Sequence, residues 1–325
     1  MAENDLVSVL IPAYNHEKYI RQALESVINQ TYGPIELLVT DDGSTDGTWA
    51  IIQEMESACR DRFQRTVFKR QENQGICQSL KGMQAEAQGC YITLMASDDL
   101  MDPGLVAESF SFLENNPAYG AVFFNSALID GDGQTIYWDE NREPVYEQAG
   151  AVYMTMGDWL SSSRPDVDYQ SPDFGNYRSL MKGNYIHSPP FYRTSLLKDT
   201  GFYTSEAPLE DWYFLLQLAK HCKMKFFDQP MWHYRWHSSN TVKQAEKMYR
   251  MALATWIYEV KQVIAAKDKK SLEDLHQLYR RYKPIAGNDK LKLYKTRSVD
   301  GKRIVLKILA AEISFRYCRD LQVFI

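Results

Sequence analysis

The chain has 325 residues, of which 45% are hydrophobic and 24% are charged. This composition is typical of a soluble globular protein with a core of useful size. The formal net charge of -5 argues against a protein that binds nucleic acid through its overall charge. The five cysteines lack a CxxC spacing, which argues against a zinc site or a disulfide framework and fits a reducing cytoplasm.

The first 130 residues alternate short apolar runs with amphipathic stretches. The opening MAENDLVSVLIPAYN lacks a basic segment and predicts a strand rather than a signal peptide, and no stretch is long enough to span a bilayer. The expected strands are Leu6–Ile11, Ile35–Thr40, Cys90–Met95 and Ala121–Phe124, and the expected helices are Glu17–Asn29, Thr48–Cys59, Ile76–Gln88 and Pro103–Leu113. This alternation predicts an α/β fold with a mostly parallel sheet flanked by helices.

The rhythm changes in the second half of the chain. Residues 131–182 are rich in Gly, Asp, Tyr, Ser and Pro without a sustained period, and they predict an insertion or long loop. A helix is expected from about Leu209 to His221 and a strand at Met224–Phe227. Residues 242–325 predict a helical C-terminal extension after a first domain of residues 1–241, with helices at Ala245–Lys267, Ser271–Tyr282 and Lys302–Asp320.

Three predicted strands end in polar or acidic residues. These ends are Pro12–Asn15, Asp41–Asp46 and Ala96–Asp99. The carboxyl ends of parallel strands meet at one edge of an open sheet, where ligands bind. A divalent cation would relieve the repulsion between gathered carboxylates and bridge them to substrate phosphates. A single acidic strand end is equally well explained as a helix cap, but three such ends favour a nucleotide diphosphate site.

Two common nucleotide-binding motifs are missing from the sequence. No GxxxxGK[ST] loop occurs, and no GxGxxG follows the first strand, which argues against a P-loop ATPase and a dinucleotide dehydrogenase.

Several motifs in order resemble the family 2 glycosyltransferases, which have the GT-A fold. The resemblance rests on the block Val7–Thr48, on Asn73-Gln74-Gly75 and on the Ser97–Asp99 SDD motif, followed by HSPPFYRTSLL, LED and YRWH, the last at Tyr234–His237. It covers roughly Leu6 to Thr241, and only the opening block and the SDD motif are highly specific. It implies an inverting transfer of a sugar from a nucleoside diphosphate, with UDP favoured and Mn²⁺ or Mg²⁺ as the cofactor.

The resemblance also implies roles for particular residues. The nucleotide-binding residues are Pro12, Ala13, Tyr14, Asn15, Glu17, Asp42, Asn73, Gly75 and Asp98, with Asp42 reading the base. Asp99 is the expected direct metal ligand, helped by Asp98 and His237. Asp211 is the expected general base, because an acceptor hydroxyl must lose its proton, and Glu210 orients or tunes it. His187 and Trp212 are expected to line the cleft for donor and acceptor.

This sequence departs from the family pattern in two places. Ala96 stands where many members have an acid, and Leu80-Lys81 replaces a common Arg-Asn pair. A purely structural role remains open for three residues. Asp211 is also explained as an acid in the first turn of a helix, and His237 as a packed histidine. For Lys81 we favour a solvated helix residue.

The C-terminal helices are basic, and Ile304, Ile308, Ala311 and Phe315 fall on one side of the last one. Such a helix binds an anionic membrane, its own domain or another subunit of an oligomer. The expected location is therefore the cytoplasm, with peripheral contact at the inner membrane face as one alternative. The expected acceptor is a saccharide or a lipid-linked molecule in bacterial surface polysaccharide or glycolipid assembly.

Two other classes of function share these features. A nucleotidyltransferase that makes sugar nucleotides also uses an α/β sheet with carboxylate-bound metal, but His16-Glu17-Lys18 poorly replaces its Gly-rich basic loop. A non-catalytic nucleotide-binding scaffold of the same fold is disfavoured by the retained acidic pairs.

Overall fold

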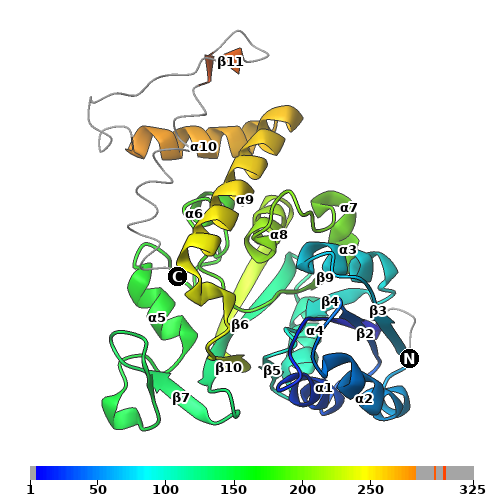
Figure 1. Cartoon of the computed structure of the whole chain (residues 1–325). Helices are drawn as coiled ribbons and strands as arrows, with labels where there is room; N and C mark the ends of the chain where they lie inside the picture. Colours follow the sequence, from blue (N-terminus) through cyan, green and yellow to red (C-terminus); the bar gives the residue numbers. More distant parts are fainter. Residues whose placement is uncertain (1–4, 283–295, 298–302, 305–325) are drawn as a thin grey trace.

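A computed structural model describes residues 5–282, 296–297 and 303–304 of the chain (Figure 1). A ten-stranded mixed sheet forms its centre, with the order β3-β2-β1-β4-β9-β6-β10-β5 and with β7 and β8 continuing beside β6. The predicted α/β class with helices on both faces of a mostly parallel sheet is confirmed.

The N-terminal half of the sheet is parallel. β1 (Val7–Ala13) pairs with β2 (Ile35–Asp41) and with β4 (Tyr91–Leu94), and β2 pairs with β3 (Arg65–Arg70). Every residue of β2 is buried, as expected for a parallel strand covered on both faces. The edge strand β3 is only partly buried and polar in sequence, which explains why the hydrophobic pattern did not predict it.

The second half of the sheet is mixed. β9 (Phe191–Arg193) runs antiparallel between β4 and β6 (Tyr119–Ile129), and β6 pairs in parallel with β10 (Lys223–Arg235). β10 then pairs in an antiparallel manner with the short β5 (Leu100–Met101). Both β6 and β10 are longer than predicted, and β9 was not predicted, because three residues carry no readable period.

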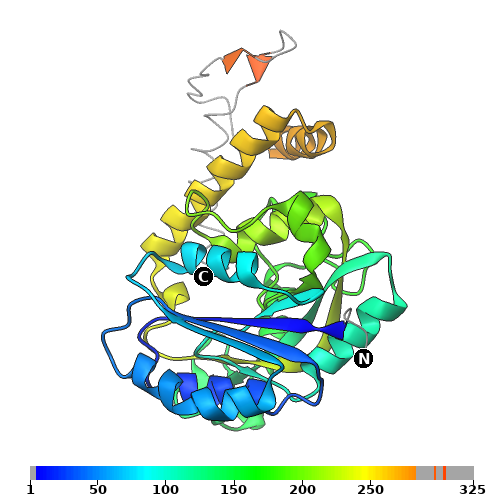
Figure 2. The ribbon, with the colours of Figure 1, turned by 90° about the vertical axis from the view of Figure 1, so that its right-hand side faces the viewer.

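Helices cover both faces of the sheet (Figure 2). The buried hydrophobic side chains form two separate cores. One core contains residues of α1 (Ile20–Ile28), α2 (Thr48–Arg62) and α4 (Leu105–Asn115). The other contains residues of α3 (Ile76–Glu86), α8 (Glu210–His221) and α9 (Ala245–Ala266). The six helices match predicted segments, with ends shifted by a few residues.

Residues 131–182 are more ordered than predicted. They form a hairpin of β7 (Thr135–Trp138) and β8 (Pro144–Val145), followed by the short helices α5 (Met156–Ser163) and α6 (Tyr177–Leu180). A capping box at Thr155 and Asp158 starts α5. Figure 1 shows the hairpin and α5 at the opposite side of the molecule from α1 and α2.

The helix α9 packs against the first domain rather than standing free. Buried Glu259 accepts hydrogen bonds from Gln217 of α8 at 2.7 Å and from Tyr177 of α6 at 2.8 Å, and it pairs with Lys220 at 2.6 Å. α10 (Lys269–Tyr282) follows, and Arg178 pairs with its Asp274. This network joins the C-terminal helices to the core.

A helix was predicted at Lys302–Asp320, but only Arg303 and Ile304 of this segment are described. These two residues form the short strand β12 (Arg303–Ile304), which pairs with β11 (Thr296–Arg297). The rest of that segment lies outside the described residues, so its membrane contact stays a prediction. Within the described ranges, no helix has the length and apolar character needed to cross a membrane.

Candidate active site

The acidic strand ends meet at one edge of the sheet, as the order of the strands requires. Ala13 pairs with Asp41 in register, and the Asp42 backbone N–H donates to the Ala13 carbonyl at 2.8 Å. β4, on the other side of β1, leads into Ser97–Asp99. The PAYN segment therefore lies between the two acidic strand ends.

Asp99 is a buried residue whose carboxylate accepts two hydrogen bonds from β10. Its Oδ2 accepts a hydrogen bond from Trp232 Nε1 at 2.9 Å, and its Oδ1 accepts one from the Arg235 backbone N–H at 2.9 Å. Burial, followed by repulsion from Asp98, raises the pKa of Asp99 well above its ordinary value. Both oxygens are thus engaged with β10, which differs from the predicted role of Asp99 as the direct metal ligand.

Asp98 points instead at two imidazoles. Its Oδ2 lies 3.1 Å from His237 Nε2 and 3.8 Å from His16 Nε2. Burial works to raise the pKa of Asp98, but the hydrogen bond with His237 and the two nearby imidazoles outweigh it, so the pKa is lowered. The predicted residues Asp98 and His237 are therefore brought together from opposite halves of the sheet.

His16 is a site residue that the motif analysis did not assign. Its Nδ1 lies within hydrogen-bond distance of Ser97 Oγ, at 2.7 Å, which turns Nε2 toward Asp98. Its place directly after the PAYN segment was the available signal, because a residue that follows a strand end at this edge faces the same site.

The position of His237 is fixed by the turn that follows β10. Asn240 accepts a hydrogen bond from the His237 backbone N–H at 2.7 Å and donates one to the Arg235 carbonyl at 3.0 Å. Ser239 Oγ lies 2.8 Å from His237 Nδ1, so the second ring nitrogen is also held. Such contacts to the second nitrogen orient an imidazole that binds a ligand through the first.

Arg235, which was also not assigned, ties the elements around Asp98 together. Its buried guanidinium donates to the Asp98 backbone carbonyl at 2.6 Å, to the Asp130 carbonyl at 3.1 Å and to Gln22 at 2.7 Å. It also lies 5.0 Å from the centre of the Tyr19 ring. These contacts make Arg235 a structural residue of the site.

Asp42 organises the loop that contains Asn73 and Gly75. Its carboxylate accepts hydrogen bonds from Gln71 Nε2 at 2.7 Å, from the Gln74 N–H at 3.0 Å and from the Gly75 N–H at 2.8 Å. Gly75 has a φ of 83°, which favours glycine. A carboxylate has about four acceptor positions, so Asp42 retains one for a further donor.

The neighbouring Asp41 has an unsatisfied oxygen. Its Oδ2 contacts Arg70 Nε at 3.2 Å, whereas its buried Oδ1 has no hydrogen-bond partner in the described structure. An unsatisfied buried acceptor is costly, and the Asp41 side chain is fully enclosed by protein.

The PAYN segment divides into an exposed ring and supporting residues. Tyr14 is 46% exposed, whereas Asn15 and Glu17 hold the next loop through hydrogen bonds from Thr45 N at 2.8 Å and Gly47 N at 2.7 Å. Pro12 is half-buried and Ala13 is buried. Tyr14 is therefore the residue of this segment with a free face for stacking.

Glu210 and Asp211 lie in the first turn of α8. Asp211 is exposed, and its carboxylate accepts hydrogen bonds from Asn184 Nδ2 at 3.0 Å and from the Trp212 N–H at 2.6 Å. Desolvation of the carboxylate by the surrounding protein raises the pKa of Asp211, and burial together with repulsion from Asp211 raises the pKa of Glu210 to about 8. Asn184 belongs to none of the motifs, so its contact with Asp211 could not be predicted.

Tyr234 is a partly buried residue of β10. Its pKa is raised by burial first and then by the charges of Asp99, Asp98 and Asp211, while Arg142 lowers it.

The two residues predicted to line the cleft differ in exposure: Trp212 is buried, whereas His187 is partly exposed. Trp212 is 2% exposed and donates a hydrogen bond to the Leu180 carbonyl at 2.8 Å, so it packs in the core rather than lining a cleft. Both ring nitrogens of His187 are buried without a hydrogen-bond partner in the described structure, and burial lowers its pKa to about 3.

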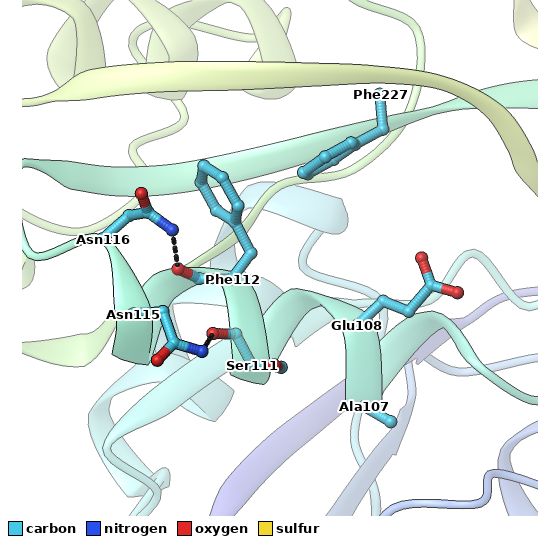
Figure 3. Close-up of a pocket in the computed structure, with 7 residues that line it drawn as sticks. All are labelled: Ala107, Glu108, Ser111, Phe112, Asn115, Asn116 and Phe227. Carbon is cyan, nitrogen blue, oxygen red and sulfur yellow. Dashed lines mark hydrogen bonds between the residues drawn. The ribbon is translucent and has the colours of Figure 1, made fainter.

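A separate pocket of about 480 Å³ lies on α4 and β10 (Figure 3). It is lined by Ala107, Glu108, Ser111, Phe112, Asn115, Asn116 and Phe227. None of the predicted site residues lines it.

The fold agrees with comparisons to known proteins. Residues 8–158 match the family model described as Glycosyl transferase family 2. This part of the chain is a family 2 glycosyltransferase domain, and the predicted resemblance and enzyme class are confirmed.

Curated relatives match the same part of the chain. The chondroitin synthase of Escherichia coli is 35% identical over 143 residues, which are 44% of this chain and 20% of that protein. Glycosyltransferase GlyG of Streptococcus pneumoniae is 28% identical over 165 residues, which are 49% of this chain and 53% of that protein. The matched region thus spans about a fifth to about half of these relatives.

Solved structures share the fold over a longer stretch. S. aureus TarS in complex with UDP-GlcNAc has a TM-score of 0.57 at 18% identity, covering 88% of this chain and 76% of that one. The mannosyltransferase PcManGT from Pyrobaculum calidifontis, in complex with GDP-Man and Mn²⁺, has a TM-score of 0.56 at 14% identity, covering 78% and 64%. At these identities, the likeness concerns the fold alone.

Proposed function

We propose that the chain transfers a sugar from a nucleoside diphosphate, UDP in the first instance, to an acceptor hydroxyl with inversion at the anomeric carbon. The observation that carries this proposal is the meeting of Asp98 with His237 and His16 at the strand edge. The relatives include polysaccharide synthases, which supports a role in bacterial surface polysaccharide or glycolipid assembly.

The nucleotide is proposed to bind over the ends of β1 and β2. Tyr14 offers its exposed ring to the base, and the Asp42 loop with Asn73 and Gly75 forms the wall beside it. The remaining acceptor position of Asp42 is suited to an N–H group of a base such as uracil.

The side chains around Asp98 fit a divalent cation only together with a substrate. No set of three or more His, Cys, Asp or Glu side chains in the described ranges is arranged to hold an ion. Asp98 and His237 supply one carboxylate and one imidazole, and Mg²⁺ or Mn²⁺ commonly takes its other ligands from phosphates and water. We propose Asp98 and His237 as the ligands, with Asp99 supporting them from β10.

When bound, such an ion neutralises charge on the departing diphosphate. The other steps fall to the chain itself. His16 has an imidazole facing the same oxygen of Asp98 and is available to a phosphate oxygen. Asp98, held by Arg235 through its carbonyl, keeps its orientation before the donor arrives.

Asp211 is proposed to be the general base. The acceptor oxygen attacks the anomeric carbon, the bond from that carbon to the diphosphate oxygen breaks with its electron pair, and the hydroxyl proton passes to Asp211. A raised pKa makes Asp211 a better proton acceptor than an ordinary aspartate. Asn184 orients it, and Glu210 adjusts its charge.

The test is release of nucleoside diphosphate from a panel of UDP-sugars and GDP-mannose by the purified full chain. We expect release from a UDP-sugar that depends on Mn²⁺ or Mg²⁺, is lost in EDTA and is restored by added metal. Metal-independent binding of nucleotides without turnover across the panel, with acceptors present, would contradict the proposal and favour the scaffold. Synthesis of a UDP-sugar from UTP and a sugar phosphate would favour the nucleotidyltransferase.

A further inference from the structure

Two cations beside the proposed site rest on tryptophan rings instead of pairing with acids. The Arg142 guanidinium lies 4.7 Å from the centre of the Trp159 ring, and Lys243 Nζ lies 4.0 Å from the centre of the Trp236 ring. Among the ion pairs of the described residues, none involves Arg142 or Lys243.

The rings that carry these cations belong to one cluster next to His237. Trp138 lies 4.9 Å from Trp236 and 6.0 Å from Trp159 between ring centres. We call Trp138, Trp159 and Trp236 the tryptophan wall. Trp236 directly precedes the proposed metal ligand His237 in the sequence.

Tyr234 joins this cluster to β10. Its ring centre lies 6.4 Å from that of Trp236. Arg142 also acts on Tyr234, because the guanidinium lowers the pKa of the phenol.

The backbone is arranged to present Arg142. Its φ of 64° lies in the left-handed region, which costs free energy for a residue with a side chain. Asp139 holds this turn because its Oδ1 accepts hydrogen bonds from the Asn141 and Glu143 N–H groups, both at 2.8 Å. Glycine or asparagine would suit this conformation better, so the arginine side chain has to contribute something other than the turn.

The surroundings leave both cations without an adequate counter-charge. Burial lowers the pKa of Arg142, and the groups that oppose this are the phenols of Tyr234 and Tyr153 rather than carboxylates. Burial also lowers the pKa of Lys243, and the exposed Glu143 only partly offsets it without forming an ion pair. In addition, Trp138 Nε1 is buried without an acceptor in the described structure.

We propose that Arg142 and Lys243 form an acceptor subsite for a saccharide that carries an oxyanion, either the carboxylate of a uronic acid or a phosphate on the sugar. This inference rests on the proposed function and specifies the chemistry of its acceptor. An arginine fork matches the geometry of both oxyanions, and the partly exposed Trp236 supplies an apolar face for the sugar ring.

The experiment compares three small probes of the same ring: methyl glucoside, methyl glucuronide and methyl glucoside 6-phosphate. Their affinities for the full chain are measured by ligand-observed NMR with UDP and Mn²⁺ present. We expect the glucuronide or the 6-phosphate to bind about tenfold more tightly than the glucoside, as a charge-assisted hydrogen bond provides. Whichever anionic probe shows the gain identifies the source of the oxyanion.

The variants Arg142→Gln and Lys243→Gln should each reduce this preference, and the double variant should abolish it. Lys261→Gln removes an exposed lysine of α9 and should keep the wild-type preference. Arg142→Lys retains the positive charge and should preserve most of the preference. This variant shows whether a loss in Arg142→Gln comes from the missing charge. Circular dichroism checks that each variant is folded.

Equal binding of the three probes to the wild type, or a preference that survives in the folded double variant, would overturn the subsite. The donor assay reports separately on the proposed function. A wild-type chain that prefers an anionic probe but releases no diphosphate from any donor would retain the subsite while refuting the transferase.

Discussion

Asp98 and Asp211 carry the two proposed halves of the reaction, yet different parts of the chain hold them. Asp98 follows β4, and the parallel strands β1 and β2 beside it bring Asp42 and the PAYN segment to the same edge. Asp211 stands at the start of α8, where Asn184 and the packing of α9 fix it. The donor side is thus built by sheet register, whereas the base is positioned by contacts between segments distant in sequence.

α9 provides the clearest of these distant contacts. The Leu209 N–H, just before Glu210, donates to Thr255 Oγ1 of α9 at 2.9 Å, and Thr255 is fully buried. The base side therefore depends on residues after position 241, where the sequence predicted a separate extension.

Replacing the proposed base should have the largest effect on turnover. Asp211→Asn keeps the shape of the side chain but removes its ability to accept the hydroxyl proton. We expect the transfer rate to fall by about 10²–10⁴-fold with donor binding retained. Saturation kinetics measure the transfer rate, and calorimetric titration with UDP measures donor binding. A transfer rate within a few-fold of wild type would mean that another group accepts the proton.

Asp98→Asn tests the donor side. The loss of one carboxylate should reduce metal-dependent diphosphate release by about two to three orders of magnitude. It should also abolish the stabilisation by UDP with Mn²⁺ in thermal unfolding. Asp99→Asn is the matched comparison. If the metal still stabilises Asp98→Asn but no longer stabilises Asp99→Asn, then Asp99 is the metal ligand, as the motif alone predicts.

Asp99→Ala should affect stability more than Asp98→Asn does. It leaves the buried Trp232 indole and the Arg235 N–H without acceptors, at about 1–3 kcal/mol for each group. Denaturant unfolding should therefore show a loss of a few kcal/mol. Stability equal to wild type would mean that these donors find other partners.

Glu210→Gln should change how stability depends on pH. Folded Glu210 titrates near pH 8 rather than 4.5. Between these values, the unfolded chain binds fewer protons, so this group lowers stability as pH rises. The variant should gain stability over wild type at pH 8.5, and the gain should vanish near pH 4.5. Glu72→Gln, an exposed control, should show no such trend.

Thr255→Val should give the smallest effect. It preserves the volume but leaves the Leu209 N–H unsatisfied, which costs about 1–3 kcal/mol, and Thr255→Ser should restore the bond. If turnover falls in the valine variant and recovers in the serine variant, α9 positions the base; an equal loss in both would indicate packing alone.

The sequence predicted the donor side more fully than the base side. The apolar period of β1, β2 and β4 and the acids at their ends are local, so Asp42 and Asp98 were found in the right place. The relative orientation of Asp98 and Asp99 is not local: it depends on Trp232 and Arg235, more than 130 residues later. The same reason explains why Asn184 and Thr255 carry no signal.

Edge and inserted strands were missed for a different reason. β3 is half polar, and β9 has three residues, so neither shows the alternation of a buried strand. The hairpin of β7 and β8 was expected to be irregular, although its turn, which Asp139 holds, is what presents Arg142.

The hydrogen bond from Leu209 to Thr255 joins α8 to α9, so these two helices should be kept together in a chimera with a relative. The region that matches the family model ends at residue 158, before Asp211, His237 and α9. A chimera that exchanges residues 8–158 would therefore inherit the nucleotide-binding edge of one parent and the proposed base and acceptor surface of the other. Donor preference should follow the exchanged segment, while acceptor choice should remain with the rest of the chain.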